Sequence, residues 1–150
     1  MKETNIFELI QAIEKMNNEN IMRFTKAFDY PIGISPILVL AALHYEGPQK
    51  QKELAERVGY TKGAMTHIAE KLVSLGLAGR VYDEADRRTI RLEITAAGEQ
   101  ALAKAQQIGQ EVFMDAFKVL NEEEIEQYLK LQKKLLQGMK DRKLQQNKNE

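Results

Sequence analysis

The stretch from residue 51 to residue 76 contains two short helical patterns separated by a glycine, and it constrains the fold more than any other part of the chain. Residues 51–58 carry helix-forming side chains, and Gly59 suits the left-handed conformation that ends a helix in a tight turn. Thr61 is a favourable N-cap for a second helix, which Gly76 ends. The predicted inward face of this second helix comprises Ala64, Met65, Ile68, Ala69, Leu72 and Leu75.

A β-hairpin with a polar tip is predicted directly after this pair of helices. Residues 77–81 and 89–94 are typical of strands, and apolar and polar side chains alternate along the second of them, as in a half-buried strand. The residues between the strands, YDEADRR, form the tip and end in the basic pair Arg87-Arg88. Two helices around a turn, followed by such a hairpin, form a winged helix-turn-helix. In this motif one helix enters the major groove of duplex DNA, and the wing reaches phosphates or the minor groove.

Two helices are predicted before this module. The first covers about residues 5–28, and its polar stretch at residues 17–20 favours a kink or a division into two helices. Ser35-Pro36 resembles an N-cap followed by a proline at the first helical position. The helix that it opens is apolar nearly all round, so we expect this helix to be buried and His44 on it to be a core histidine.

Two further helices are predicted after the hairpin. Thr95 caps a helix over about residues 96–120, and Asn121 with Glu124 resembles a capping box that opens the last helix. Apolar stripes on the terminal helices cannot be buried within so small a core, so we expect these helices to pair two subunits. The residues expected in this dimer interface are Ile6, Ile10, Ile13, Ile125, Leu129, Leu135 and Leu136.

Together these elements predict a single domain that is mainly α with a small β-wing. A winged helix-turn-helix covers residues 34–95, and dimerisation helices flank it at residues 1–33 and 96–139. Residues 140–150 are charged and polar, so we expect them to form a disordered tail.

The composition excludes several other classes of protein. No apolar run approaches the length of a membrane span, and the first residues lack the apolar segment of a signal peptide, so we expect a cytoplasmic protein without membrane contact. The chain has no cysteine, which excludes disulfides, thiolate zinc sites and thiol redox sensing. Its two histidines, His44 and His67, are too few to suggest a metal site, and no cofactor is expected.

The charges are unevenly distributed, although the formal net charge is zero. Residues 57–91 carry seven Lys or Arg against four Asp or Glu, whereas residues 92–131 carry three against eight. The local charge decides how strongly a surface attracts phosphate, so the basic excess on the winged module favours DNA binding.

The outward face of the second short helix is the candidate reading surface. Lys62 can neutralise a phosphate, and Gly63 lets the helix N-terminus approach the DNA backbone closely. On an isolated helix, these polar side chains would most simply form a solvated face. The position of this helix, after a helix and turn and before a wing, favours contact with DNA instead. The DNA-binding residues predicted on this helix and its cap are Thr61, Lys62, Gly63, Thr66, His67 and Glu70.

The wing supplies a second set of candidate contacts. Asp86 lies two residues before Arg88, so its carboxylate can hold the guanidinium in a fixed orientation before DNA arrives. An arginine aimed in this way suits a narrow minor groove, whereas Arg87 and Arg91 are better placed for phosphates. The alternative is a charged hairpin tip that serves only solubility.

The ordered set of these features resembles the MarR family of transcriptional regulators, from about residue 36 to residue 98. No single one of these short sequence features is specific to the family, whereas the ordered set with this spacing is. The pieces are Leu54-Ala55, Gly59, Thr61-Lys62-Gly63-Ala64-Met65-Thr66, Leu72, Leu75-Gly76-Leu77, Arg80, Asp83, Asp86-Arg87-Arg88, Leu92, Thr95 and Gly98.

The resemblance implies a homodimer bound to a pseudo-palindromic operator in double-stranded DNA. One recognition helix of each subunit would enter successive major grooves, with half-sites about 34–36 Å apart. The resemblance also implies a repressor that is released by a small aromatic or phenolic effector. Aromatic side chains available for an effector crevice are Phe24, Phe28, Tyr30 and Tyr45, although a plain hydrophobic core is the simpler role for them.

Two other functions stay open on the sequence alone. The chain could be a winged-helix protein-interaction module without specific DNA binding, although Lys62, Arg87 and Arg88 argue against this. It could also be a ligand-independent activator. Catalysis is not expected, because the sequence offers no nucleophile–base pair, no glycine-rich phosphate loop and no metal cluster.

Overall fold

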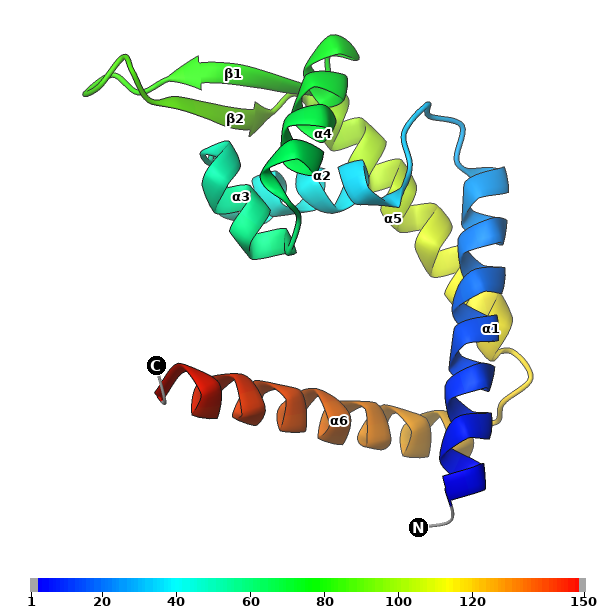
Figure 1. The fold of residues 1–150 in the computed structure, drawn as a ribbon. Helices are drawn as coiled ribbons and strands as arrows, with labels where there is room; N and C mark the ends of the chain where they lie inside the picture. The colour runs from blue at the N-terminus through cyan, green and yellow to red at the C-terminus, as the bar shows by residue number, and fades with distance from the viewer. Residues whose placement is uncertain (1–2, 149–150) are drawn as a thin grey trace. The chain divides into compact units, whose positions relative to one another are not determined.

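The computed structural model describes residues 3–148, which form six helices and a two-stranded sheet (Figure 1). The chain divides into two units, Met1–Val112 and Phe113–Glu150. The elements follow in the order α1 (Glu3–Ala27), α2 (Ile34–Glu46), α3 (Gln51–Val58), α4 (Lys62–Ser74), β1 (Ala78–Tyr82), β2 (Ile90–Ile94), α5 (Ala96–Phe117) and α6 (Glu122–Lys148). The structure thus confirms the prediction of a mainly α fold with a small β-wing.

The first unit is built around one hydrophobic core. α2, α3, α4 and the sheet group together, and the β1–β2 hairpin extends away from the helices (Figure 1). The most deeply buried large side chains come from all of these elements, and α5 adds small and aliphatic side chains along one face. The large side chains are Val39, Leu40, Leu43, Leu54, Met65, Leu72 and Leu92. Burial of this set orients α4 and the wing on a common support.

The turn between α3 and α4 forms as its glycine predicts. Gly59 adopts φ 75° and ψ 28°, the left-handed conformation, and its N–H donates to the carbonyl oxygen of Ala55. Thr61 then caps α4, because its Oγ1 accepts a hydrogen bond of 3.1 Å from the N–H of Ala64. These local bonds fix where α4 begins.

The wing is an antiparallel pair in which Tyr82 lies opposite Ile90 and Ala78 opposite Ile94. A third segment joins it at the base. Gln49, two residues before α3, exchanges backbone hydrogen bonds of 3.0 and 2.8 Å with Leu92. The base of the wing is therefore tied to the helix-turn-helix through the main chain.

Two sequence predictions about the first helices were wrong. α1 is a single helix of 25 residues, without the break that its polar stretch favoured. α2 begins at Ile34 with Gly33 as its N-cap, not at the Ser35-Pro36 cap, so Pro36 lies within the first turn, where its missing N–H leaves no bond unmade.

α2 is buried on one face only, and His44 is not a core residue. The buried face comprises Val39, Leu40 and Leu43, whereas Tyr45 is 71% exposed. His44 follows Leu43 by one helical step, so its side chain turns away from the core and is exposed. Its Nδ1 lies 2.6 Å from Oε2 of Glu99 in α5. The prediction of a buried helix with a core histidine fails because so small a unit covers only one side of α2.

The second unit consists of the end of α5 and the whole of α6. The capping box at the start of α6 is present, with Asn121 N–H donating to Glu124 and Glu124 N–H donating to Asn121. α6 continues to Lys148, so residues 140–148 are helical where the sequence predicted a disordered tail. Contacts one turn apart, such as Gln137 Nε2 to Asp141 Oδ1 at 2.9 Å, support these last turns. None of the 27 residues of α6 is buried.

Candidate nucleic-acid interface

α4 presents a polar face opposite its buried one. Met65, Ile68, Ala69 and Leu72 are buried against the core. The face that points to solvent holds every residue predicted from the sequence to read DNA on this helix, all of them exposed: Thr61, Lys62, Gly63, Thr66, His67 and Glu70. Ala64 and Leu75, which were predicted to face inward, are exposed instead, because the first lies in the opening turn and the second is the C-cap of the helix.

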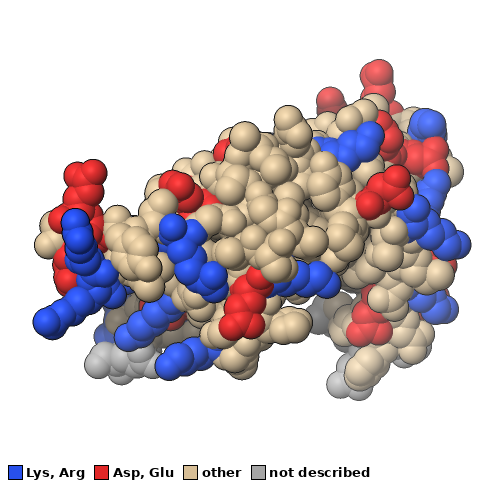
Figure 2. Space-filling model, turned by 90° about the horizontal axis from the view of Figure 1, so that it is seen from above, with Lys and Arg blue, Asp and Glu red and all other residues tan. Residues whose placement is uncertain are grey.

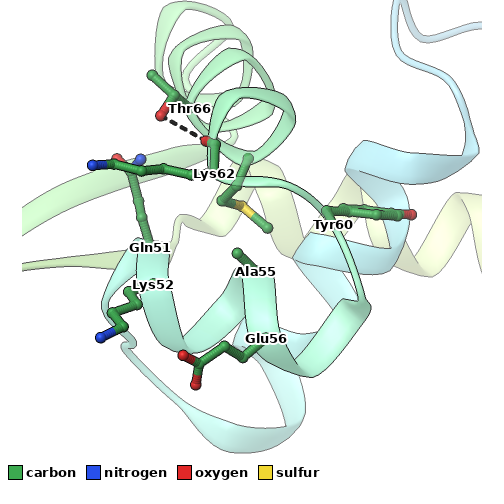
Figure 3. Close-up of a pocket in the computed structure, with 8 residues that line it drawn as sticks. Gln51, Lys52, Ala55, Glu56, Tyr60, Lys62 and Thr66 are labelled. Carbon is green, nitrogen blue, oxygen red and sulfur yellow. Dashed lines mark hydrogen bonds between the residues drawn. The ribbon is translucent and has the colours of Figure 1, made fainter.

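A groove of about 540 Å³ runs between α3 and α4 beside this face (Figure 3). Its floor is formed by Ala55, Tyr60 and Met65, and its rim carries polar side chains from both helices. The rim residues are Gln51, Lys52 and Glu56 from α3, and Lys62 and Thr66 from α4. Two lysines on opposite helices can approach a phosphate chain that crosses the groove.

Gln51 and Lys52 were not singled out from the sequence. They lie at the start of α3, and only the tight α3–α4 turn brings them beside Lys62 and Thr66. No motif marks them, because a lysine in the first turn of a short helix is common on protein surfaces. The tertiary packing of the two helices was the missing information.

At the tip of the wing, Asp86 organises the backbone instead of holding a guanidinium. Its Oδ1 accepts a 3.0 Å hydrogen bond from the backbone N–H of Arg88, and its Oδ2 lies 3.4 Å from the hydroxyl of Thr89. The N–H of Thr89 in turn donates to the carbonyl oxygen of Asp86. Asp86 therefore bonds the main chain of the wing tip and not the guanidinium that the sequence predicted, because an Asp carboxylate readily accepts from the N–H two residues ahead.

The two arginines of the tip, Arg87 and Arg88, are exposed. Beside them, Tyr82 and Arg87 line a shallow depression of about 370 Å³. Tyr82 is 65% exposed and faces Ile90 across the hairpin, so the wing also carries an apolar surface that the sequence reasoning missed.

Arg91 is in a different situation from Arg87 and Arg88. Its Nη1 lies 3.8 Å from Oε2 of Glu53 in α3, and its Nη2 lies 3.8 Å from Oδ2 of Asp83 in the wing. Its predicted phosphate contact therefore competes with two carboxylates.

The aromatic residues considered for an effector crevice do not form one group. Phe28 is buried and stacks on Phe24 and on Tyr30, with ring centroids 5.1 Å apart in both pairs. These three rings belong to the core region. Tyr45 lies elsewhere, with its hydroxyl accepting a 3.2 Å hydrogen bond from Gln106 in α5.

The charges over the surface are mixed in sign. Figure 2 shows acidic and basic side chains interspersed around a central region of uncharged residues.

Within residues 3–148, no group of three or more His, Asp or Glu is placed to hold a metal ion. None of the described helices is both long enough and apolar enough to cross a membrane.

Comparison with known proteins decides the family. The MarR family's sequence profile matches residues 34–90, which span the helix-turn-helix and the hairpin up to the first residue of β2. The HTH-type transcriptional repressor MdtR of Bacillus subtilis is 34% identical over 113 residues, covering 71% of this chain and 70% of that protein. The chain belongs to the MarR family. It is a DNA-binding transcriptional regulator of the winged-helix type, as the sequence predicted.

Other members of the MarR family agree in sequence and fold. The HTH-type regulator YkoM of Bacillus subtilis is 27% identical over 130 residues, covering 87% of this chain and 83% of that protein. A MarR family protein from Bacillus stearothermophilus matches the structure with a TM-score of 0.81 and 23% identity, over 93% of this chain and 99% of that one. YkoM is named a transcriptional regulator, and the Bacillus stearothermophilus protein shows the likeness in fold.

Among solved structures with the same fold, one is a complex with operator DNA, and another is of a protein whose DNA binding is regulated by a small molecule. A mutant MarR from E. coli complexed with operator DNA has a TM-score of 0.71 and 22% identity, and the match covers 91% of this chain and 99% of that one. The structure of BpsR from Bordetella bronchiseptica, whose DNA binding is regulated by 6-hydroxynicotinic acid, has a TM-score of 0.68 and 18% identity, over 85% of this chain and 98% of that one.

Proposed function

We propose that the protein is a homodimeric repressor that binds a pseudo-palindromic operator and is released from it by a small aromatic or phenolic ligand. The observation that carries the DNA-reading part is the exposed polar face of α4, which includes the N-terminus of that helix. The wing that follows α4 carries a second exposed basic group at its tip. The proposed DNA contacts are Thr61, Lys62, Gly63, Thr66, His67, Glu70, Arg87 and Arg88.

Each contact has a distinct chemical role. Lys62 and Arg87 neutralise phosphates, and Thr66 and His67 reach base edges in the major groove. Glu70 can accept a hydrogen bond from the amino group of cytosine. Arg88, whose backbone N–H is held by Asp86 and whose side chain is exposed, enters the minor groove.

The unburied apolar side chains of the terminal helices support a dimer. On α1, Ile10 and Ile13 are exposed, and Ile6 is half-buried. On α6, the residues expected at the interface are all exposed, with Leu135 at 57%. A helix of 27 residues that buries none of its apolar residues requires a partner surface, and a second copy of the chain offers a self-complementary one. The α6 residues concerned are Ile125, Leu129, Leu135 and Leu136.

The proposals that the protein represses transcription and is released by a ligand are supported by what its relatives are named. MdtR is named a repressor, and BpsR has its DNA binding regulated by a hydroxylated aromatic acid. A ligand releases the operator only if it binds the unbound conformation more tightly, so its affinity must fall when DNA is present.

The test is selection of bound duplexes from a random DNA pool, followed by fluorescence anisotropy titration of the enriched sequences. We expect an inverted repeat whose half-sites lie about one helical turn apart. Weak, salt-sensitive binding to every duplex without enrichment would contradict operator recognition and support a protein-interaction module. A reporter gene placed behind the selected operator then separates repression from ligand-independent activation by the sign of its response.

A further inference from the structure

We propose that Arg91 is a positioning residue that sets the angle of the wing against the helix-turn-helix, and that its guanidinium does not bind a DNA phosphate. This inference rests on the proposed operator binding for its functional consequence. The sequence assigns Arg91 to the phosphates together with Arg87, but the surroundings of the two side chains differ.

The first step is the geometry of the guanidinium. It spans two elements, with Nη1 3.8 Å from Glu53 of α3 and Nη2 3.8 Å from Asp83 at the start of the wing tip. The planar guanidinium directs two nitrogens toward the two carboxylates at a fixed separation, whereas a lysine ammonium is a single point charge on a flexible stem. Arg91 thus links α3, the helix before the recognition helix, to the start of the wing tip.

The second step is charge. One guanidinium between two carboxylates leaves a local balance of −1 when all three groups are ionised. Such a group repels phosphate more than it attracts it, whereas Arg87 at the tip is exposed and carries its positive charge outward. The side chain of Arg91 is also only 33% exposed, so it reaches less far into solvent.

The third step is that both carboxylates are themselves held in place. Glu53 accepts a hydrogen bond from the backbone N–H of Lys50 at the start of α3. Asp83 accepts one of 3.0 Å from the N–H of Ala85, and its own N–H donates to the carbonyl oxygen of Thr89. Arg91 therefore connects two fixed points.

The fourth step concerns the attachment of the wing. A two-stranded ribbon has little stability of its own, and among the described residues a backbone bridge joins the wing strands to a third segment only at Leu92, through Gln49. Arg91 is the next residue toward the tip, so its ion pairs extend this attachment outward by one position. A small rotation at this point moves Arg87 and Arg88 away from the DNA together.

The experiment compares charge-neutralising variants that keep the local hydrogen bonds. Glu53→Gln and Asp83→Asn retain an oxygen acceptor for the neighbouring N–H groups and remove only the charge that faces Arg91. Glu84→Gln is the matched control for DNA binding, because this exposed acid lies next to Asp83 in the wing tip and its substitution removes the same charge. Glu56→Gln, on α3 like Glu53, is a control only for the measurement without DNA, since Glu56 lines the groove beside α4. Arg91→Ala and Arg91→Lys complete the series. Operator affinity is measured by anisotropy at several salt concentrations.

The change in operator affinity should differ in sign between the variants that break the ion pairs and the control. Glu84→Gln should bind DNA as tightly as the wild type or more tightly, because it removes a negative charge from the wing tip. Glu53→Gln and Asp83→Asn should instead weaken operator binding by about threefold to tenfold, since they release the wing. Arg91→Ala should weaken binding without lowering the salt slope, and Arg91→Lys should restore less than half of the lost affinity because lysine lacks the rigid fork that fixes the two acids relative to each other.

A phosphate contact predicts the reverse pattern and would overturn the inference. In that case Arg91→Ala lowers the salt slope by about 0.9, Arg91→Lys keeps most of the affinity, and Glu53→Gln strengthens binding. That result leaves the proposed operator function intact, because the wild type still selects its operator.

A second measurement needs no DNA. Hydrogen exchange of the wing amides in the free protein should be about threefold faster or more in Arg91→Ala and Glu53→Gln, but not in Glu56→Gln. Unchanged exchange in all three variants would show that the ion pairs do not hold the wing. This readout decides the positioning role even if the protein selects no operator.

Discussion

Gly98, in the first turn of α5, packs directly against the backbone carbonyl oxygen of Leu77, the residue before β1. A Cβ atom at position 98 would overlap that oxygen and would lie 2.7 Å from Cγ1 of Ile94. Thr95 strengthens the same junction, because its hydroxyl donates a 2.6 Å hydrogen bond to the carbonyl oxygen of Gly76 and accepts one from the N–H of Gly98. The base of the wing and the start of α5 are thus fitted backbone to backbone.

Gly98→Ala should lower the free energy of unfolding by about 1–3 kcal/mol, because the backbone must shift to admit a methyl group. Gly109→Ala is the matched control in the same helix, since a Cβ there meets nothing within 4 Å. The control should stabilise the protein by up to about 1 kcal/mol through helix propensity. Urea unfolding followed by circular dichroism measures both, and equal effects of the two substitutions would refute the close approach.

The pair of His44 and Glu99 should show a small but measurable coupling. In a double-mutant cycle of His44→Ala and Glu99→Ala, we expect an interaction free energy of about 0.2–1 kcal/mol, because both side chains are more than 40% exposed. The coupling should shrink as salt is added at a pH where the histidine is charged. Strict additivity at low salt would show that the contact contributes nothing to holding α2 on α5.

Arg88→Ala should weaken operator binding, and the dependence of this loss on the flanking DNA sequence distinguishes a minor-groove contact from a phosphate contact. If Arg88 occupies the minor groove, the loss of affinity should be larger on operators with A·T-rich flanks, where the groove is narrow. Arg142→Ala removes the same charge from α6 and should leave the flank dependence unchanged. Equal losses on all flanking sequences, with a salt slope lowered by about 0.9, would place Arg88 on a phosphate instead.

Leu129→Asp should disrupt the proposed dimer and, with it, selective operator binding. The substitution sets a carboxylate on the apolar side of α6, where burial of a charge is costly. Gln127→Asp introduces a charge on the opposite face of the same helix and should leave the dimer unchanged. Light scattering gives the mass of each variant, and a dimeric Leu129→Asp protein would move the interface elsewhere.

The elements that the sequence predicted well are those whose signals are local. Gly59, Thr61 and the Asn121–Glu124 capping box are recognisable within four residues, and all three form as expected. The alternating strand after the wing tip was equally clear. Helix ends without a side-chain signal were placed less well, as at Gly33 and beyond residue 140.

The residues of the candidate site also fall into those with a local sequence signal and those without one. The reading face of α4 could be predicted because a helix of known period must turn its polar side away from its apolar one. Lys52 and Tyr82 were missed because their relevance depends on which element packs beside them. Asp86 was recognised as an organiser of the wing, but its partner proved to be a main-chain N–H.

The sequence by itself determined the order of the elements, the turn at Gly59 and the polar face of α4, because backbone preferences and side-chain periodicity act over a few residues. Only the tertiary structure decided that His44 meets Glu99 and that Arg91 lies between Glu53 and Asp83. His44 and Glu99, like Arg91 and Glu53, stand far apart in the chain, and burial of one shared core, rather than any local signal, sets the distances between them.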